Sequence, residues 1–214
     1  VPSEKVTTVH LAPHERYKPQ PSNLVKSTIS RLKLPSQYLL FVGTFEPRKN
    51  ISGLLKAYAS LLDKQHDAPP LIMIGRKGWL HEPIETLVHK LNLSEQVQIR
   101  TNIDTDDLPA IYTGALALLL PSHYEGFGFP VLESMACGTT AVISNRGSLP
   151  EIANDAALQC DPDSFASIED SILLLLTDTK LREELEMKGL KRSAMFTWQK
   201  CCQETLDIYK KVLQ

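Results

Sequence analysis

Two glutamates, Glu125 and Glu133, bracket a glycine-rich stretch in the sequence HYEGFGFPVLES, residues 123–134. Pro130 suits the first turn of a helix, and a helix that begins there would leave the backbone amides of Gly126 to Phe129 free. Free amides at the positive end of a helix bind anions and hydroxyls, and carboxylates accept hydrogen bonds from the hydroxyls of sugars. The spacing therefore predicts a site for a ligand that carries phosphate between two polyol groups.

A pair of cations, Arg48 and Lys49, lies in the sequence PRKN, after an apolar run and before a helical pattern. Cations at the start of a helix oppose the helix dipole. This local conflict favours a functional role for the two residues over a mere charge pair at a helix entrance.

Short apolar runs alternate with helical patterns from residue 38 onward. Runs that are apolar throughout are typical of strands buried on both faces of a parallel sheet. The alternation predicts an α/β fold with a doubly wound parallel sheet and C-terminal helices, in which ligands bind beyond the carboxyl ends of the strands. The predicted strands are YLLFVG (38–43), PLIMIG (70–75), QVQIRT (96–101), ALALLLP (115–121), TAVIS (140–144) and ALQC (157–160).

The chain divides into three parts by composition. Residues 1–36 are polar and marked by prolines, and we interpret them as an interdomain segment with a strand candidate at 5–13 and a short helix near 23–32. Residues 37–162 form the predicted sheet domain. Residues 163–214 are helical throughout, and we expect these helices to pack on the core, with the last one reaching toward an N-terminal domain outside this sequence.

Three polar residues are predicted to cap helices. Asn50, Thr105 and Thr197 each stand directly before a helical pattern. Their side chains are of the types that accept hydrogen bonds from the free amides of a first helical turn.

Composition and charge exclude several classes of function. A formal charge of −2 and a pI near 6.3 give no overall attraction to nucleic acid or to an anionic membrane. No apolar run reaches the roughly 18 residues of a membrane span, and the first ten residues lack the profile of a signal peptide. The four cysteines have no metal-ligand spacing and two are adjacent, which favours reduced thiols. We therefore expect a cytoplasmic protein, with peripheral docking on the inner face of the membrane as an open alternative.

Residues 125–133 match the E-x7-E signature of the retaining GT-B glycosyltransferases, a group that includes bacterial mannosyltransferases, sucrose synthase and glycogen synthases. The resemblance covers almost the whole chain, but only the C-terminal donor domain of the family, which is Rossmann-like; complete members also carry an N-terminal acceptor domain. Further segments that resemble the family in order are LLFVGTFEPRKNISGLLKAY (39–58), LIMIGRKGW (71–79), GSLPEI (147–152), LQCDP (158–162) and FTW (196–198).

The resemblance implies roles for the cations and for one glutamate. Glu133 would hold the ribose hydroxyls, although from spacing alone it could equally be a solvated glutamate on a helix surface. Lys49 would contact the diphosphate, assisted by Arg48. Many members carry an arginine at the position of Thr44, so phosphate neutralisation in this chain would fall to Lys49 and Arg48.

The resemblance also implies contacts to the donor sugar and to the base. Glu125 would engage the donor sugar together with the backbone amides of Gly126, Phe127, Gly128 and Phe129. The base would lie against the loop that follows the third predicted strand, around Arg100 to Ile103.

The implied activity is transfer of a hexosyl group with retention at the anomeric carbon. The donor would be GDP-mannose first and UDP-glucose second, and the acceptor a glycan or a lipid-linked molecule held by the absent N-terminal domain. Lys49, Arg48 and the helix amides would stabilise charge on the leaving diphosphate without a metal, and we expect no cofactor. The family is usually described as using the leaving phosphate as the proton acceptor, so neither glutamate is assigned as nucleophile or base.

Other classes of function compete with this one. Glycosidase chemistry by the two glutamates is a formal competitor, but a spacing of eight residues across a loop and a helix does not fix the separation of the carboxyl groups. A nucleotide-binding or regulatory module would hold the same ligand without transferring it. A dinucleotide-dependent oxidoreductase is disfavoured, because no G-x-G-x-x-G follows the first predicted strand.

Overall fold

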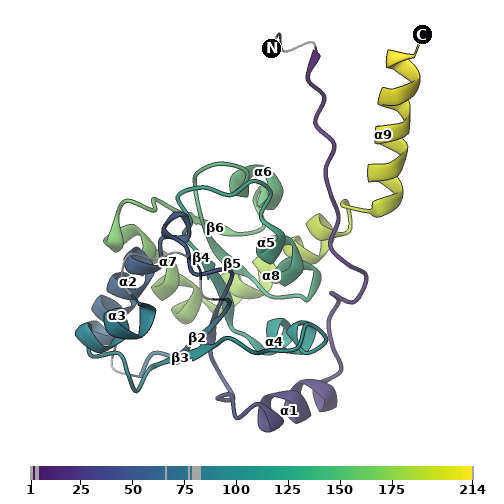
Figure 1. Ribbon diagram of the computed structural model, residues 1–214. Coiled ribbons are helices and arrows are strands. Elements are labelled where there is room, and N and C mark those ends of the chain that lie inside the picture. The colour runs from purple at the N-terminus through teal and green to yellow at the C-terminus, as the bar shows by residue number, and fades with distance from the viewer. Residues whose placement is uncertain (1, 3–4, 66, 77, 79–82, 214) are drawn as a thin grey trace.

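Six parallel strands form one sheet in the order β3-β2-β1-β4-β5-β6 in the computed structural model, which describes residues 2, 5–65, 67–76, 78 and 83–213 (Figure 1). The side chains of the four central strands are almost all buried, as their apolar sequences predict. All six predicted strands and the α/β fold are confirmed, whereas Lys77 and Trp79 of the second family-like segment lie outside the described residues. The strands are β1 (Leu39–Val42), β2 (Leu71–Ile74), β3 (Val97–Arg100), β4 (Ala117–Leu120), β5 (Ala141–Ser144) and β6 (Leu158–Cys160).

Helices cover both faces of the sheet (Figure 1). On one face α2 packs against α7, and on the other α4 packs against α1 and α5, while α5 also contacts α6 and α8. This division follows from right-handed crossovers between parallel strands. The helices are α1 (Ser22–Arg31), α2 (Ile51–Lys64), α3 (Ile84–Lys90), α4 (Leu108–Gly114), α5 (Phe129–Ala136), α6 (Leu149–Ala153), α7 (Phe165–Thr177), α8 (Thr179–Ser193) and α9 (Trp198–Val212), with the 3-10 helix η2 (Pro47–Lys49).

The strand order reverses between β1 and β4, which pair side by side in the centre of the sheet. The loop after β1 (43–50) and the loop after β4 (121–128) both leave the carboxyl edge at this point. In open α/β sheets, ligands bind in the crevice at such a reversal. The sheet therefore brings the PRKN sequence and the glycine-rich stretch to the same place.

Asn50 does not cap α2 as predicted. Its backbone is left-handed (φ 53°), and its side chain makes no cap hydrogen bond. The side-chain amide instead donates to the carbonyl oxygens of Pro121 and Pro162, at 3.1 and 2.7 Å. The cap prediction is wrong because the left-handed backbone turns the side chain toward these buried carbonyls. Asn50 thereby ties together the loops that follow β1, β4 and β6.

Thr105 does not cap α4 either. The helix begins three residues later, at Leu108, with Asp107 at the N-cap position. Residues 105–107 form a turn in which the Asp106 amide donates to the Asp104 carboxylate at 3.0 Å. The prediction is wrong because an aspartate that accepts a local hydrogen bond stabilises a turn in competition with the helix.

The N-terminal residues 5–21 contain no strand, so the strand predicted at 5–13 is wrong. In Figure 1 the first part of this segment projects on the same side as α9, and the rest runs along the body of the molecule toward α1, outside the sheet. An extended run becomes a strand only when a neighbouring strand accepts its hydrogen bonds, and the sheet offers none here. The short helix predicted near 23–32 is confirmed as α1.

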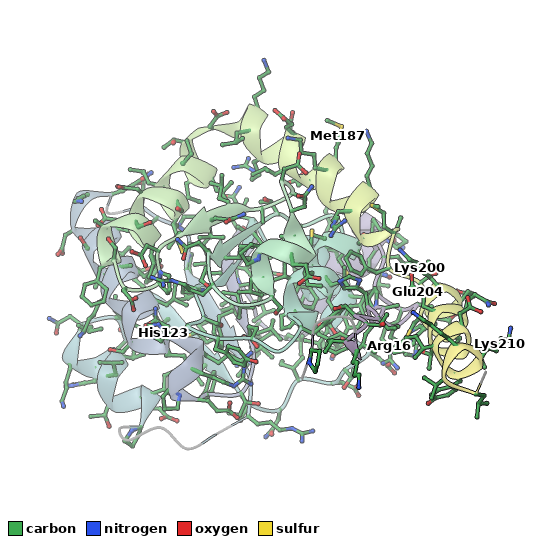
Figure 2. The ribbon with its side chains drawn as sticks, turned by 90° about the horizontal axis from the view of Figure 1, so that it is seen from above. Arg16, His123, Met187, Lys200, Glu204 and Lys210 are labelled. Atoms are coloured by element: carbon green, nitrogen blue, oxygen red, sulfur yellow. The ribbon has the colours of Figure 1, made fainter. Side chains whose placement is uncertain are left out.

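The last helix, α9, stands apart from the rest of the fold. Thr197 caps it as predicted, because its hydroxyl accepts a hydrogen bond from the Lys200 amide at 3.1 Å. Figure 2 shows α9 on the opposite side of the molecule from His123, which belongs to the loop after β4. Among the described residues, no helix combines the length and the apolarity that crossing a membrane requires.

Asn50→Ala should lower the free energy of unfolding by about 2 to 4 kcal/mol, because it leaves buried carbonyls unpaired and because alanine tolerates a left-handed backbone less well than asparagine does. Asn92→Ala is the matched control: Asn92 is exposed but also left-handed (φ 57°), so its loss should be about 1 kcal/mol. Urea unfolding of both variants measures the difference. Equal losses would show that the Asn50 side chain does not join the loops.

Candidate functional site

A buried ion pair between Lys49 and Glu125 lies where the strand order reverses. Nζ of Lys49 is 2.5 Å from Oε1 of Glu125, and the two side chains are each only 6% exposed. The buried hydroxyl of Ser122 donates to the same oxygen at 2.8 Å. Lys49 ends the short helix η2 after β1, and Glu125 follows β4, so the pair connects two loops that are far apart in sequence.

Arg48 adds a second cation to the same carboxylate. Its Nη1 donates to Oε2 of Glu125 at 2.8 Å, and its Nε donates to the Glu46 carboxylate, also at 2.8 Å. The carbonyl oxygen of Arg48 accepts a hydrogen bond from the His123 amide at 2.8 Å. Side-chain and backbone contacts thus hold the two loops together, and two carboxylates balance the charges of Lys49 and Arg48.

The glycine-rich stretch presents free backbone. Within the described part of the chain, the amides of Gly126 to Phe129 donate no hydrogen bond to a protein group. Gly128 is left-handed (φ 102°) at the N-cap of α5, which begins at Phe129, one residue before the predicted start at Pro130. A Cβ added to Gly126 would meet no atom within 4 Å. The amides and the helix dipole therefore form an open cradle for an anion or a hydroxyl.

Ser148 fixes the outer side of this cradle. Its hydroxyl lies 2.9 Å from the carbonyl oxygen of Glu125 and 3.0 Å from that of Phe127. It precedes α6, so a third loop, the one after β5, helps to shape the stretch. Because the carbonyls are held from this side, the cradle is built before any ligand arrives.

Glu133 has different surroundings from Glu125. One of its carboxylate oxygens accepts a hydrogen bond from the hydroxyl of Tyr112 at 2.9 Å, and the hydroxyl of Tyr17 faces the same carboxylate and lowers its pKa. Burial raises the pKa of this carboxyl to about 7, against the opposing effect of the two hydroxyls. Among the described residues, no lysine or arginine forms an ion pair with it. Glu133 is therefore an acceptor whose described partners are uncharged hydroxyls.

Two aromatic rings flank the cradle. Phe127 and Phe129 lie with ring centroids 5.0 Å apart, and His10 from the N-terminal segment lies 6.5 Å from Phe127. Phe129 is 37% exposed, so this part of the stretch offers an apolar surface beside the free amides.

The residues predicted to contact the base lie farther along the same edge. Arg100 ends β3, two strands away from β1, which is about 10 Å at ordinary strand spacing. Its Nη2 donates to Gln98 at 3.0 Å, whereas its buried Nε has no partner. Arg100 and Ile103 line a pocket of about 300 Å³ together with Leu32. Thr44 is half-buried just after β1.

The predicted residues therefore do not all meet at one point. Glu133 lies apart from the cations, against Tyr112. The structure brings Arg48, Lys49 and Glu125 into direct contact, and it sets Arg100 and Ile103 apart in their own pocket. The sequence analysis missed Ser122, Ser148, Tyr112 and Tyr17. Ser148 stands inside the family-like segment GSLPEI, and Ser122 directly precedes the glycine-rich stretch, whereas no local pattern distinguishes the two tyrosines.

This arrangement can hold a phosphorylated polyol. The cations and the free amides suit anionic oxygens, and Glu133 suits a pair of neutral hydroxyls. Glu125 is already paired with two cations, so it can act on a ligand only while it also orders Lys49 and Arg48.

Comparison with known proteins yields a family and several relatives. The family described as glycosyl transferases group 1 matches residues 26–192. O-antigen chain mannosyltransferase B of Escherichia coli is 37% identical over 210 residues, which cover 98% of this chain and 55% of that protein. The chain thus spans about half the length of this relative.

Solved structures share the fold. Sucrose-phosphate synthase from Thermosynechococcus elongatus is 26% identical with a TM-score of 0.80, over 95% of this chain and 51% of that one. Anabaena Alr3699/HepE, solved in complex with UDP and glucose, is 17% identical with a TM-score of 0.82, over 97% of this chain and 57% of that one. The sheet order, the Rossmann-like GT-B architecture and the family match over most of its length agree, and the chain belongs to the glycosyl transferases group 1 family.

Proposed function

We propose that this chain is the donor-binding domain of a retaining hexosyltransferase, and that the crevice between the loops after β1 and β4 holds a nucleoside diphosphate sugar. The observation that carries the proposal is the buried Lys49–Glu125 pair beside the unpartnered amides of Gly126 to Phe129. It supports a ligand with both anionic oxygens and hydroxyls. A simple phosphate site would need no carboxylate at its centre.

The diphosphate has two sets of donors in this proposal. Lys49 and Arg48 approach from the loop after β1, and the amides at the start of α5 approach from the loop after β4. When the bond to the sugar breaks, negative charge grows on the β-phosphate, and donors that are already in place stabilise it without reorganisation. We therefore propose a metal-independent transfer in which the leaving phosphate accepts the proton of the acceptor hydroxyl.

The sugar and the ribose occupy opposite sides of the cradle. Glu125 accepts hydrogen bonds from donor-sugar hydroxyls while it orders the two cations, and Glu133 accepts those of the ribose. The base lies against Arg100 and Ile103, because their pocket follows the next strands along the same carboxyl edge. Thr44 lies between these regions.

The choice of donor rests on the relatives. The E. coli relative is an O-antigen mannosyltransferase, so we propose GDP-mannose as the donor and a growing glycan or a lipid-linked sugar as the acceptor, with UDP-glucose as the second candidate. The acceptor would bind to a domain outside this sequence, with peripheral membrane association where it is lipid-linked. The same relative argues against a module that only binds nucleotide.

Titration calorimetry of this chain in EDTA should show binding of GDP-mannose and GDP, with weaker binding of UDP-glucose and UDP, because the proposed contacts need no metal. Full binding of UDP-glucose with none of GDP-mannose would reverse the assignment of the base. Binding of NAD, or of no nucleotide at all, would contradict the proposal.

Lys49→Met should lower the affinity for GDP by about ten- to a hundredfold and leave the affinity for guanosine unchanged, because only the diphosphate contacts the ammonium group. Lys56→Met, at an exposed position of α2, is the matched control and should change neither affinity. The urea midpoint of each variant monitors folding. An equal loss for GDP and guanosine would remove Lys49 from the phosphate site.

Glu133→Ala should weaken binding of GDP-mannose about tenfold or more through a lost charged hydrogen bond. The loss should vanish for 2′,3′-dideoxy-GDP, which has no ribose hydroxyls to donate. A persistent loss with that ligand would contradict the ribose assignment.

The pH dependence gives an independent reading of the same contact. Because the carboxyl of Glu133 titrates near 7 and only its ionised form accepts from both hydroxyls, affinity for GDP-mannose should rise about tenfold between pH 6 and pH 8. Glu133→Gln should give a flat profile over this range, and an unchanged slope in that variant would assign the pH dependence to another group.

A further inference from the structure

Tyr17 brings the N-terminal segment to the edge of the candidate site. Its ring meets that of Tyr112 edge to face, with centroids 5.9 Å apart and planes at 72°. The hydroxyl of Tyr112 donates to the Glu133 carboxylate at 2.9 Å, and the hydroxyl of Tyr17 faces the same carboxylate and lowers its pKa. Tyr112 belongs to α4 and is fully buried, whereas Tyr17 comes from a segment outside the regular elements.

Polar contacts on either side hold Tyr17 in place. Arg16 forms an ion pair with Asp106 at 2.5 Å, in the turn before α4, and the Gln20 amide donates to the hydroxyl of Thr113 near the end of α4 at 3.2 Å. The Tyr17 amide closes a turn onto the carbonyl oxygen of His14 at 3.0 Å. Exposed ion pairs of this kind contribute little to stability, so the segment is held in register along α4 by contacts that are individually weak.

The same segment also touches the cradle. The His10 ring contacts Phe127 and Phe196, and its Nε2 bonds to Glu151 at the start of α6 at 2.7 Å. Residues 10–17 therefore reach both sides of the proposed ligand, with His10 beside the glycine-rich stretch and Tyr17 beside Glu133.

Among the described residues, the groups that face Glu133 are all uncharged. They are Tyr112 from α4, Tyr17 from the N-terminal segment, and Cys137, which directly follows α5. Burial raises the pKa of the Cys137 thiol to about 12. Burial also raises the pKa of both tyrosines. With no cation among the described residues that face it, the carboxylate depends on the two hydroxyls for its orientation and for what stabilises its charge.

We propose that Tyr17 is a positioning residue for donor binding: it covers Glu133 and directs its carboxylate, so that the placement of the N-terminal segment sets the affinity of the site. This inference rests on the proposed function, because it takes Glu133 as the ribose acceptor. A shift of the segment along α4 withdraws one hydroxyl and one ring from Glu133 and leaves the contacts among Lys49, Arg48 and Glu125 unchanged.

Two substitutions of Tyr17 separate its hydroxyl from its ring. Tyr17→Phe keeps the ring beside Tyr112 and removes a hydroxyl that lowers the pKa of the Glu133 carboxyl, so the midpoint at which Glu133 titrates should move up. Tyr17→Ala also opens the site to water, and because burial is the largest influence on this carboxyl, the midpoint should move down. Carbon-13 NMR of labelled glutamate side chains measures the midpoint, and Glu133→Gln identifies the signal.

Binding of GDP-mannose gives the functional readout. At pH 7, Tyr17→Phe should bind about three- to tenfold more weakly than the parent chain, and most of this gap should close by pH 9, where the carboxyl is ionised in both. Tyr17→Ala should stay weak at pH 9, because its carboxylate is ionised but no longer directed. Tyr209→Phe, at an exposed position of α9, is the matched control and should change nothing.

The outcomes distinguish this inference from the function on which it rests. If the parent chain binds GDP-mannose but both Tyr17 variants keep its titration midpoint and its affinity, the inference is overturned and the proposed function stands. If the parent chain binds no nucleotide, the proposed function fails. Opposite shifts of the titration midpoint in the two variants would then still show that Tyr17 positions Glu133, without a role in donor binding. Shifts in the same direction would reject the separate roles of hydroxyl and ring.

Discussion

The ion pair between Lys49 and Glu125 is the contact on which the rest of the candidate site depends. It is buried, and it lies at the reversal of strand order between the two central parallel strands, β1 and β4. A buried charge that loses its partner is strongly destabilising, so each residue fixes the loop of the other. The other contacts between these loops, from Arg48 to Glu125 and from the His123 amide to the Arg48 carbonyl, reinforce the same junction. The cradle of free amides begins directly after this anchored glutamate.

The two glutamates of the glycine-rich stretch have the same side chain but opposite electrostatic surroundings. Glu125 faces two cations and a serine hydroxyl, whereas Glu133 faces phenol hydroxyls and a thiol, and its pKa rises toward neutrality. Their positions explain the difference. Glu125 lies in the loop at the carboxyl edge, where the chain after β1 supplies lysine and arginine, and Glu133 lies one turn into α5, where it meets the apolar side of α4.

The sequence predicted the sheet well because its strands are buried on both faces, and nothing but a continuous apolar run satisfies such a position. It also located the junction of the PRKN sequence and the glycine-rich stretch, since the carboxyl ends of parallel strands share one edge. The errors at Asn50 and Thr105 both show that a cap is a weak local preference. A distant carbonyl competes for the Asn50 side chain, and a local turn closed by Asp104 competes with the helix at Thr105. The pairing of Lys49 with Glu125, and that of Tyr17 with Glu133, join residues 76 and 116 positions apart in the chain. No periodic pattern in the sequence predicts contacts between residues so far apart.

The charge balance at the junction has a consequence for selectivity. Lys49 and Arg48 are already matched by Glu125 and Glu46, so an arriving anion competes for cations that have partners. A bare polyphosphate offers only hydrogen-bond acceptors. It would displace the carboxylates from the cations and leave the carboxylates without donors. A ligand that has hydroxyl donors together with its phosphates replaces both sets of contacts. Its phosphate oxygens bind the cations, and its hydroxyls donate hydrogen bonds to the glutamate. The neutral junction would thus discriminate against the abundant free phosphates of a cell, a form of exclusion that an uncompensated cluster of lysines and arginines does not provide.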